Sequence, residues 1–600
     1  MSYLLFVVAL AMNPVGYNVY ELPKLWVLGV LVFVGCLGLW ARGEIRLPRG
    51  KWVWALLIGW MLSLVVSTVF SEAPWISLIG DGQRYQGLIS HFLYISIFLL
   101  SLSYFTYEDD REKLYSVTLW GTMIVCGYAI LQSLGIDLYL AESLMDFKGR
   151  VFSTFGHPNL LGQFLLFPFW IAVYEWKKKR SLKSALVVGA ITWVLFLTGN
   201  RASWIGVGLG GLFYLTRNIS LKKQLGMWSG GVGLFSFLIF LTRPSLSSFW
   251  HRWEVWKATL GVLPEAGVIG FGLERFTQAF EGVIPVEMYE YEYVYVVVDR
   301  AHQFFLDLFV TQGLFGVVVV AGVMVGLARV VYRGWGTMNN EQWMIVLSML
   351  SLITSLQFGF LGVSHSVEIA VLLGLFIVLF FEKIKINHTF KNSYALIVGV
   401  VFVVLLYSTR VMVADSVFSF GRLSFDSGDI YKALAQMELS TVIHPHQEYL
   451  YTQLGGVLYV LRLTGGDELM GGAALESFDK AAKYKGEDFR YFFEKARVYL
   501  AMGQEDIAEE YFNLAQQESG NKVVLYEEWA RVRFDKGDVS GSQQLLEKYF
   551  FILPRIHRRV GELDTLSSQE KTRLRLLLKN TDYFKMRILW NKAQKNRPKK

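Results

Sequence analysis

The chain has 600 residues, which exceeds the length of one compact domain, so at least two domains are expected. Hydrophobic residues make up 53% of it and charged residues only 18%, too few to cover a soluble surface of this size, which excludes a wholly water-soluble protein. The only two cysteines, Cys36 and Cys126, both lie in apolar runs, which excludes a disulfide framework.

A helix needs about 20 mostly apolar residues to cross the hydrocarbon core of a membrane, and residues 1–410 supply a series of such runs. The first run has no basic residues before it and no small-residue cleavage site after it, so we interpret it as a membrane helix and not as a cleaved signal. About 12–13 membrane helices are predicted, at residues 2–13, 25–41, 53–70, 87–104, 115–134, 157–174, 185–199, 202–216, 227–242, 303–327, 343–360, 366–381 and 394–410.

The distribution of Lys and Arg between alternate loops predicts the orientation of these helices. One set of loops carries 19 basic residues, and the other carries 10, of which five lie in the long loop 243–302. Long loops report orientation poorly, so only the short loops are compared: one set has 19 basic residues and the other has five. The first set is therefore predicted to be cytoplasmic, which places the N-terminus inside and residues 411–600 outside. Its loops are 42–51, 111–113, 177–183, 217–223, 329–333 and 383–391.

Basic residues in the predicted outer loops work against this orientation signal, so we expect them to have a second role. For any single basic residue, contact with lipid phosphates or a local ion pair explains its position as well as a second role does. Together, several guanidinium groups on one face match the charge and geometry of a diphosphate. These residues are Arg84, Arg150, Arg201, Arg252, Arg275 and Arg300, with His302 beside the last of them.

Four segments of the outer loops carry the candidate site. GDGQRYQGL (80–88) precedes a helix that begins at the outer side, and GRVFSTFGHPNLLGQF (149–164) breaks the chain with Gly and Pro. TGNRASWIG (198–206) interrupts two apolar runs, and non-helical backbone at membrane depth must face protein or a wet cavity. DRAHQFFLDLFVTQGLFG (299–316) places His302 at the outer end of a helix.

The order and spacing of these motifs resemble those of the O-antigen ligase and O-antigen polymerase superfamily, which includes bacterial O-oligosaccharyltransferases. The resemblance covers about residues 1–385. Three positions depart from the family pattern, since His157 and Gln303 stand where Asn is usual and Asn200 stands where Ser is common. The resembling motifs are R-V-x-x-T-F-G-x-P-N at 150–159, T-x-x-R at 198–201, R-x-x-x-W at 252–256 followed by IGFGLERF at 269–276, and H-x-x-x-L at 302–306.

The resemblance implies a GT-C-like, inverting glycosyltransferase that takes an oligosaccharide from a polyprenyl diphosphate at the outer face of the cytoplasmic membrane. Arginines stabilise charge on a leaving diphosphate, and the outer loops hold no D-x-D or H-x-x-x-H spacing, so no metal and no cofactor are predicted. Histidine titrates nearest to neutrality, so His302 is either the base or the orienting group for the acceptor hydroxyl, or only a helix-start residue bonded to loop backbone. The candidate residues are His302 and Arg201 for catalysis, and Arg84, Arg150, Asn159 and Arg252 for substrate binding.

Residues 411–554 contain an internal repeat. ARVYLAMGQ begins at Ala496 and ARVRFDKGD begins at Ala530, an offset of 34 residues that Gly503 and Gly537 keep. Because 34 residues is the period of tetratricopeptide repeats, an α-solenoid of three or four repeats is predicted. It is either a surface for a protein or cell-wall partner or a structural cap.

The tail 555–600 carries 14 Lys or Arg against four Asp or Glu, whereas the whole chain has a net charge of +8. Outside the membrane, such a tail suits lipid phosphates or an anionic cell-wall polymer, and nucleic acid is not an expected partner.

The predicted fold is all-α, with a transmembrane helical bundle (1–410), an α-solenoid (411–554) and a basic helical tail (555–600). A rival function is a transporter or flippase of lipid-linked sugars, but transporters usually show two related membrane halves, and the sequence has no such symmetry. A third reading, a membrane anchor for a scaffold, does not need so many helices. The sequence leaves open the glycan, the acceptor (lipid, protein or growing polymer), the oligomeric state and the type of cell envelope.

The orientation is tested with reporter fusions placed after Lys179 and after residue 411. We expect the first reporter in the cytoplasm and the second outside, because the loops with 19 basic residues should stay inside. Two reporters on the same side would contradict both the orientation and the outward position of the candidate site.

Overall fold

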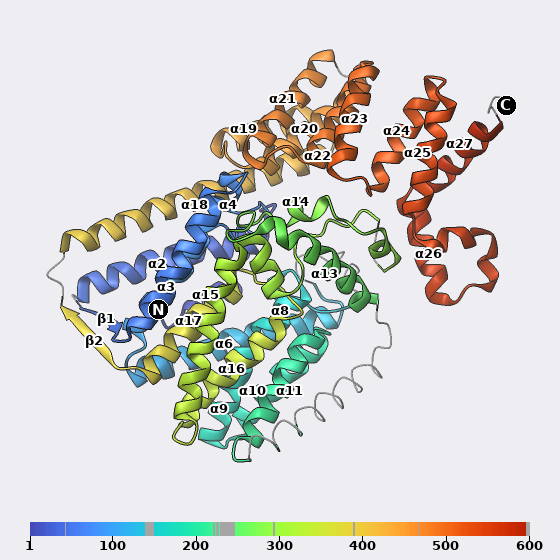
Figure 1. The fold of residues 1–600 in the computed structure, drawn as a ribbon. Helices are drawn as coiled ribbons and strands as arrows, with labels where there is room; N and C mark the ends of the chain where they lie inside the picture. The colour runs from blue at the N-terminus through green and yellow to red at the C-terminus, as the bar shows by residue number, and fades with distance from the viewer. Residues whose placement is uncertain are drawn as a thin grey trace. The chain divides into compact units, whose positions relative to one another are not determined.

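The computed structural model describes residues 1–42, 44–137, 149–219, 223, 227, 247–291, 294–387, 391–465 and 467–595. The chain divides into two compact units (Figure 1). The first contains Met1–Pro244, Val268–Glu274 and His302–His446, and the second contains Ser245–Gly267, Arg275–Ala301 and Gln447–Lys600. The long outer loop is therefore shared between the units, and it contributes more of its residues to the second.

The described residues of the first unit form α-helices, one short 3-10 helix and two strands. The strands are β1 (Glu44–Pro48) and β2 (Lys383–Asn387), and the 3-10 helix is η1 (Ser153–Phe155). The helices are α1 (Leu4–Leu10), α2 (Glu21–Arg42), α3 (Lys51–Val69), α4 (Pro74–Ile79), α5 (Leu88–Tyr104), α6 (Glu108–Ser133), α8 (Pro158–Phe164), α9 (Leu166–Lys179), α10 (Leu182–Leu197), α11 (Arg201–Thr216), α15 (Phe304–Gly334), α16 (Asn340–Leu356), α17 (Val363–Phe380), α18 (Lys391–Asp426) and α19 (Ile430–Ile443).

Six helices in the described part of the chain are long and apolar enough to cross a membrane, and two shorter apolar helices, α5 and α10, accompany them. The six are α2, α3, α6, α15, α17 and the stretch Ala395–Asp426 of α18. The prediction of an all-α, multi-pass membrane protein is confirmed.

Some predicted spans differ from the observed helices. Helix α1 has only seven residues, and at about 1.5 Å per residue it is too short to cross a membrane. It ends before Asn13–Pro14, where the proline disfavours helix in the residue before it. The predicted segment 157–174 is divided into α8 and α9, and 227–242 lies outside the described residues.

Two segments that we predict as loops pair as an antiparallel ribbon. Strand β1 lies against β2 with Ile45 opposite Ile386 (Figure 1). In both segments charged and apolar residues alternate, which is the pattern of a strand with one covered face. Both segments belong to the predicted cytoplasmic loops, so their pairing agrees with their assignment to one side.

Other contacts also join the predicted cytoplasmic loops. Arg111 forms an ion pair with Glu341, Lys178 forms one with Glu112, and Trp335 donates to the carbonyl of Arg217. The outer motifs lie at the opposite ends of the same helices, since α5 begins after Arg84 and α15 begins after His302. The grouping of loops is consistent with the structure, and which side faces the cytoplasm stays a prediction.

Helix α18 is continuous for 36 residues and packs against α2 and α19 (Figure 1). The domain boundary that we predict at residue 410 therefore falls inside a helix, and the compact units divide between His446 and Gln447.

The second unit contains helical pairs followed by the basic tail. Its outer-loop elements are α13 (Ser247–Ala266), α14 (Phe276–Glu281) and the 3-10 helix η2 (Val286–Glu290). The remaining elements are α20 (Glu448–Leu463), α21 (Glu468–Lys485), α22 (Phe489–Ala501), α23 (Glu505–Glu518), α24 (Val523–Asp535), α25 (Val539–Ile552), η3 (Arg555–Thr565), α26 (Ser568–Asn580) and α27 (Tyr583–Lys595).

Helices α20 and α21, α22 and α23, and α24 and α25 pack as pairs. The repeat read from the sequence has a structural counterpart, because Ala496 and Ala530 are both fully buried. Gly503 and Gly537 have positive φ angles of 75° and 83° in the turns that follow α22 and α24. That these pairs are tetratricopeptide repeats stays a prediction.

The buried Arg111–Glu341 pair provides a stability test. Its side chains are 9% and 11% exposed, and Tyr115 also donates to Glu341. Removing one partner leaves an uncompensated buried charge, so Glu341→Gln should destabilise the protein by roughly 3–5 kcal/mol. The matched control is Glu382→Gln, because the pair of Glu382 with Arg49 is largely exposed. Thermal unfolding in detergent should show a large drop in midpoint for the first variant and almost none for the second. Equal midpoints would refute the stabilising role of the pair.

Candidate functional site

Three of the four outer motifs meet at the ring of Phe360. The guanidinium carbon of Arg84 lies 4.3 Å from the ring centroid of Phe360, in cation–π geometry. The imidazole centroids of His302 and His157 lie 5.3 and 5.6 Å from the same ring. Phe360 is buried and follows the C-terminal end of α16. It therefore links segments that are more than 200 residues apart in sequence, from Arg84 to His302.

The fourth motif joins this group through hydrogen bonds. Arg150 donates its Nε to the carbonyl of Thr198 and its Nη2 to Oδ1 of Asn159, each at 2.7 Å. Asn200 donates to the carbonyl of Asn159 at 3.0 Å. The segments 149–164 and 198–206 are thus held together by two polar side chains, both directed at groups of the protein.

Arg201 is the first residue of α11. The break between α10 and α11 is three residues long, Thr198–Asn200, with Gly199 at a φ of 59°. Asn200 stands at the N-cap position, and its link to Asn159 places the start of α11 beside the other polar segment. Arg201 is half-buried there.

His302 precedes α15 and is not part of it, because the N-cap is Gln303. The side chain of Gln303 accepts from the Leu306 N–H at 2.6 Å and donates to Gln357 at 3.0 Å. His302 has a φ of 54°, in the left-handed region. A non-glycine residue there is strained, so the surrounding contacts must hold this histidine in place.

Strained residues gather in the outer segments. Five non-glycine residues in the described part of the chain have positive φ, and only Arg180 lies away from these segments. The other four are Tyr85, Ser153, Glu274 and His302, one in each of the segments 80–88, 149–164, 269–276 and 299–316. Backbone strain of this kind clusters at functional sites, where neighbouring structure offsets its cost.

The outer segment 268–272 inserts at a kink of α15. The kink lies at Gly313, whose φ and ψ of 65° and −167° are non-helical. Phe315 donates to the carbonyl of Val268 at 3.0 Å, and Phe271 donates to that of Val310 at 2.9 Å. A side chain at Gly313 would collide with the backbone at Val268, so glycine is required for this approach. The broken helix has its backbone groups satisfied by the inserted segment.

Lys24 lies next to the candidate site and is not among the site residues predicted from the sequence. It is fully buried, and its ammonium group donates to the carbonyls of Thr154 at 2.6 Å and of Ala11 and Tyr20 at 3.1 Å. These bonds fix η1, which precedes His157. The sequence signal is a single lysine directly before the predicted membrane span 25–41, in the first turn of α2, where a buried charge is costly and is retained only with dedicated partners.

Arg252 belongs to the second unit. It lies half-buried on α13, next to His251, whose pKa is lowered to about 4 by burial and by the charge of Arg252. Trp256, the last residue of the R-x-x-x-W motif, donates to the carbonyl of Ala301 at 2.8 Å. This bond holds the end of the outer loop next to His302 in the chain.

The outer loop is anchored to the helical pairs of the second unit. Tyr289 donates to the carbonyl of Asn521 at 3.0 Å, and Asn521 donates to that of Ile284 at 2.8 Å. Arg275 is buried and donates to the carbonyl of Lys485 at 2.6 Å. A surface of the helical pairs is therefore occupied by a segment of the same chain.

The candidate residues are thus distributed over both units. Arg84, Arg150, Asn159, Arg201 and His302 belong to the first unit, where the contacts above gather their segments, and Arg252 belongs to the second. Among the described residues, no group of three or more His, Cys, Asp or Glu is arranged as a metal site would need. Metal independence stays a prediction.

The fold and the gathered outer segments define a multi-pass membrane protein with a polar site at one end of its helices. A family model described as O-Antigen ligase matches residues 185–321. The chain therefore carries an O-antigen ligase domain at these residues, which supports the O-antigen ligase superfamily that the motifs indicate. This match supports a glycosyl-transfer or ligase role in polysaccharide assembly, and the family implies a lipid-linked glycan donor in a bilayer. No curated protein matches the chain.

A test of the site geometry uses Gly156 and Gly149. Both have positive φ, 69° and 76°, so alanine brings a similar conformational cost of about 1–2 kcal/mol at either. At Gly156 the new methyl group would collide with the ring of Tyr20, whereas at Gly149 it would meet no atom of the described residues within 4 Å. We expect Gly156→Ala to displace η1 and His157, and to lower the melting temperature and the transferase activity well below those of Gly149→Ala. Indistinguishable variants would contradict a site that depends on this close approach.

Proposed function

We propose that this protein transfers an oligosaccharide from a polyprenyl diphosphate to an acceptor hydroxyl at the outer face of the cytoplasmic membrane. The acceptor is a lipid, a protein or a growing polymer. The observation that carries the proposal is the gathering of four candidate residues of the first unit around Phe360 and the start of α11, although they are far apart in sequence. These residues are Arg84, Arg150, Asn159 and His302.

The chemistry follows from the charges involved. The bond between the anomeric carbon and the diphosphate oxygen breaks, and a bond to the acceptor oxygen forms on the opposite face of the sugar. The bonding electron pair leaves with the diphosphate, so negative charge grows on this group in the transition state. Arginine side chains match two phosphate oxygens at once, and they can stabilise this charge without a metal.

Within this proposal the arginines have different roles. Arg201 binds the diphosphate from the first turn of α11, where the helix dipole also favours an anion. Arg84 contributes a guanidinium charge beside Phe360, the ring that His302 also contacts, and binds the donor diphosphate there. Arg150 directs two of its nitrogens to Thr198 and Asn159, so it binds the donor less directly and shapes the pocket. Arg252, which belongs to the second unit, stays a sequence-based candidate for donor binding.

His302 receives the proton of the acceptor hydroxyl as that oxygen attacks the sugar. An imidazole is suited to this step because it is neutral and basic near pH 7. The strained backbone at His302 and the packing of its ring against Phe360 restrict the imidazole to one orientation. The N-terminus is cytoplasmic in this proposal, and the second unit is extracytoplasmic.

The proposal is tested with purified protein, a lipid-linked oligosaccharide and candidate acceptors, with products followed by mass. Arg201→Ala and Arg201→Lys should both lose about 10²–10³-fold in turnover, because a lysine cannot form the bidentate contact. Arg217→Lys, at the other end of α11, is the matched control and should keep full activity. Full activity in Arg201→Lys would show that a point charge is sufficient, and it would contradict the proposed bidentate contact between Arg201 and the diphosphate.

His302→Ala should lose about 10²–10⁴-fold in turnover and bind the donor almost as the native protein does, because a base acts on the acceptor. A chelator such as EDTA should leave the native rate unchanged. Full activity in His302→Ala would show that His302 is not the base. A rate that is abolished by chelator and restored by a divalent cation would refute metal independence.

A further inference from the structure

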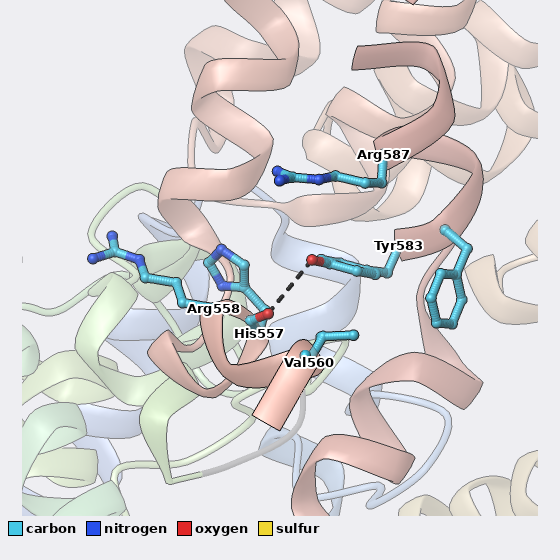
Figure 2. Close-up of a pocket in the computed structure, with 7 residues that line it drawn as sticks. His557, Arg558, Val560, Tyr583 and Arg587 are labelled. Atoms are coloured by element: carbon cyan, nitrogen blue, oxygen red, sulfur yellow. Dashed lines mark hydrogen bonds between the residues drawn. The ribbon is translucent and has the colours of Figure 1, made fainter. Parts of the chain in front are cut away.

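The basic tail of the second unit contains a cavity. Helix α27 lies against the 3-10 turns of η3, and between them is a space of about 430 Å³. This volume is in the range of small-ligand sites. Figure 2 shows Tyr583 and Arg587 on one helix, facing the turn that carries His557 and Arg558. The cavity is lined by His557, Arg558, Val560, Gly561, Tyr583, Phe584 and Arg587.

Two arginines of this cavity have no carboxylate partner within the described residues. Arg587 lies with its guanidinium carbon 5.7 Å from the ring centroid of Phe550, and Arg558 is exposed. The neighbouring carboxylates bind other cations, since Glu562 and Glu570 pair with Arg559, and Asp582 pairs with Arg531 and Lys585. Arg558 and Arg587 therefore give the cavity a positive charge that no carboxylate among the described residues pairs with.

The same cavity offers apolar faces and a hydrogen-bond acceptor. Phe584 is 56% exposed, whereas Tyr583 is buried and donates to the carbonyl of His557 at 3.4 Å. Nδ1 of His557 lies 2.8 Å from the carbonyl of Pro554 and must carry the hydrogen of this bond. Burial and the two arginines lower the pKa of His557, so it is neutral near pH 7 and its Nε2 accepts.

These groups match one chemical class of ligand. Paired guanidinium groups bind a carboxylate or a phosphate, aromatic rings pack against the C–H face of a sugar ring, and a neutral imidazole accepts a hydroxyl proton. We propose that this cavity binds an acidic saccharide, a sugar unit that carries a carboxylate or a phosphate. An anionic membrane surface would need the charge of the whole tail and would not need a cavity with aromatic walls.

The saccharide that fits this proposal is part of the acceptor or of the product polymer, and this assignment rests on the proposed transfer reaction. Binding of an acidic saccharide to the cavity does not depend on the proposed transfer reaction, because no residue of the cavity belongs to the candidate catalytic group. The cavity should therefore bind its ligand equally well in the native protein and in Arg201→Ala. If the protein binds the saccharide but transfers no glycan, the cavity proposal stands and the proposed function is refuted. If it transfers glycan but does not bind the saccharide, the proposed function stands and the cavity proposal is refuted.

The test uses the full chain in nanodiscs of zwitterionic lipid, with trigalacturonic acid as the probe and its methyl ester as the neutral control, followed by calorimetry. We expect the acid to bind and the ester to bind at least about tenfold more weakly. Arg558→Ala and Arg587→Ala should each weaken binding of the acid about tenfold. Phe584→Ala, at an exposed position, should also weaken it. Lys592→Ala removes one charge from the same helix outside the cavity and should change affinity less than about threefold.

Several results would overturn the proposal. Equal binding of the acid and the ester would remove the role of the charge, and absence of binding by the acid would remove the site. Equal losses in Lys592→Ala and Arg587→Ala would reduce the effect to the net charge of the tail. A separate arm measures co-sedimentation with phosphatidylglycerol vesicles. A loss there that is specific to Arg558→Ala and Arg587→Ala would assign the cavity to a lipid headgroup instead.

Discussion

Hydrogen-bond satisfaction of non-helical backbone is the constraint on which the site depends. In lipid, a free carbonyl or N–H group costs several kcal/mol, so a membrane helix can be interrupted only where the protein supplies partners. This chain interrupts its helices before α8, between α10 and α11, and at the kink of α15. At each place a specific group meets the need: Lys24 binds the carbonyl of Thr154, Arg150 binds that of Thr198, and segment 268–272 pairs with the kinked turn of α15.

This constraint separates two kinds of charged residue that look alike in the sequence. Lys24 and Arg150 direct their N–H groups at backbone carbonyls and build the walls of the site. The guanidinium carbon of Arg84 lies 4.3 Å from the ring centroid of Phe360, and Arg201 starts a helix whose N-terminal groups favour an anion. A polar site of this kind needs both kinds of residue, because ligand-binding charges are useful only when the backbone around them is fixed.

The long outer loop connects the site residues with the helical pairs. Its central part, 268–274, belongs to the first unit and lies in the kink of α15, whereas the flanking parts belong to the second unit. Tyr289, Asn521 and Arg275 attach these flanks to the helical pairs, and Trp256 holds Ala301, the residue before His302. The helical pairs are therefore more than an appended module, since they bind the loop that carries Arg252 and leads to the candidate base.

The sequence by itself determined the class of this protein, because composition and the length of apolar runs depend only on the solvent around each segment. It also indicated the family, the outer motifs and the 34-residue repeat, since polar breaks, glycines and buried alanines leave local signals. Only the tertiary structure decided which of these residues meet. Phe360 carries no local signal, and it becomes the centre of the site because Arg84, His157 and His302 reach it from distant segments. The pairing of β1 with β2, the short α1 and the role of Lys24 also depend on contacts between residues far apart in the chain, which hydrophobic periodicity cannot report.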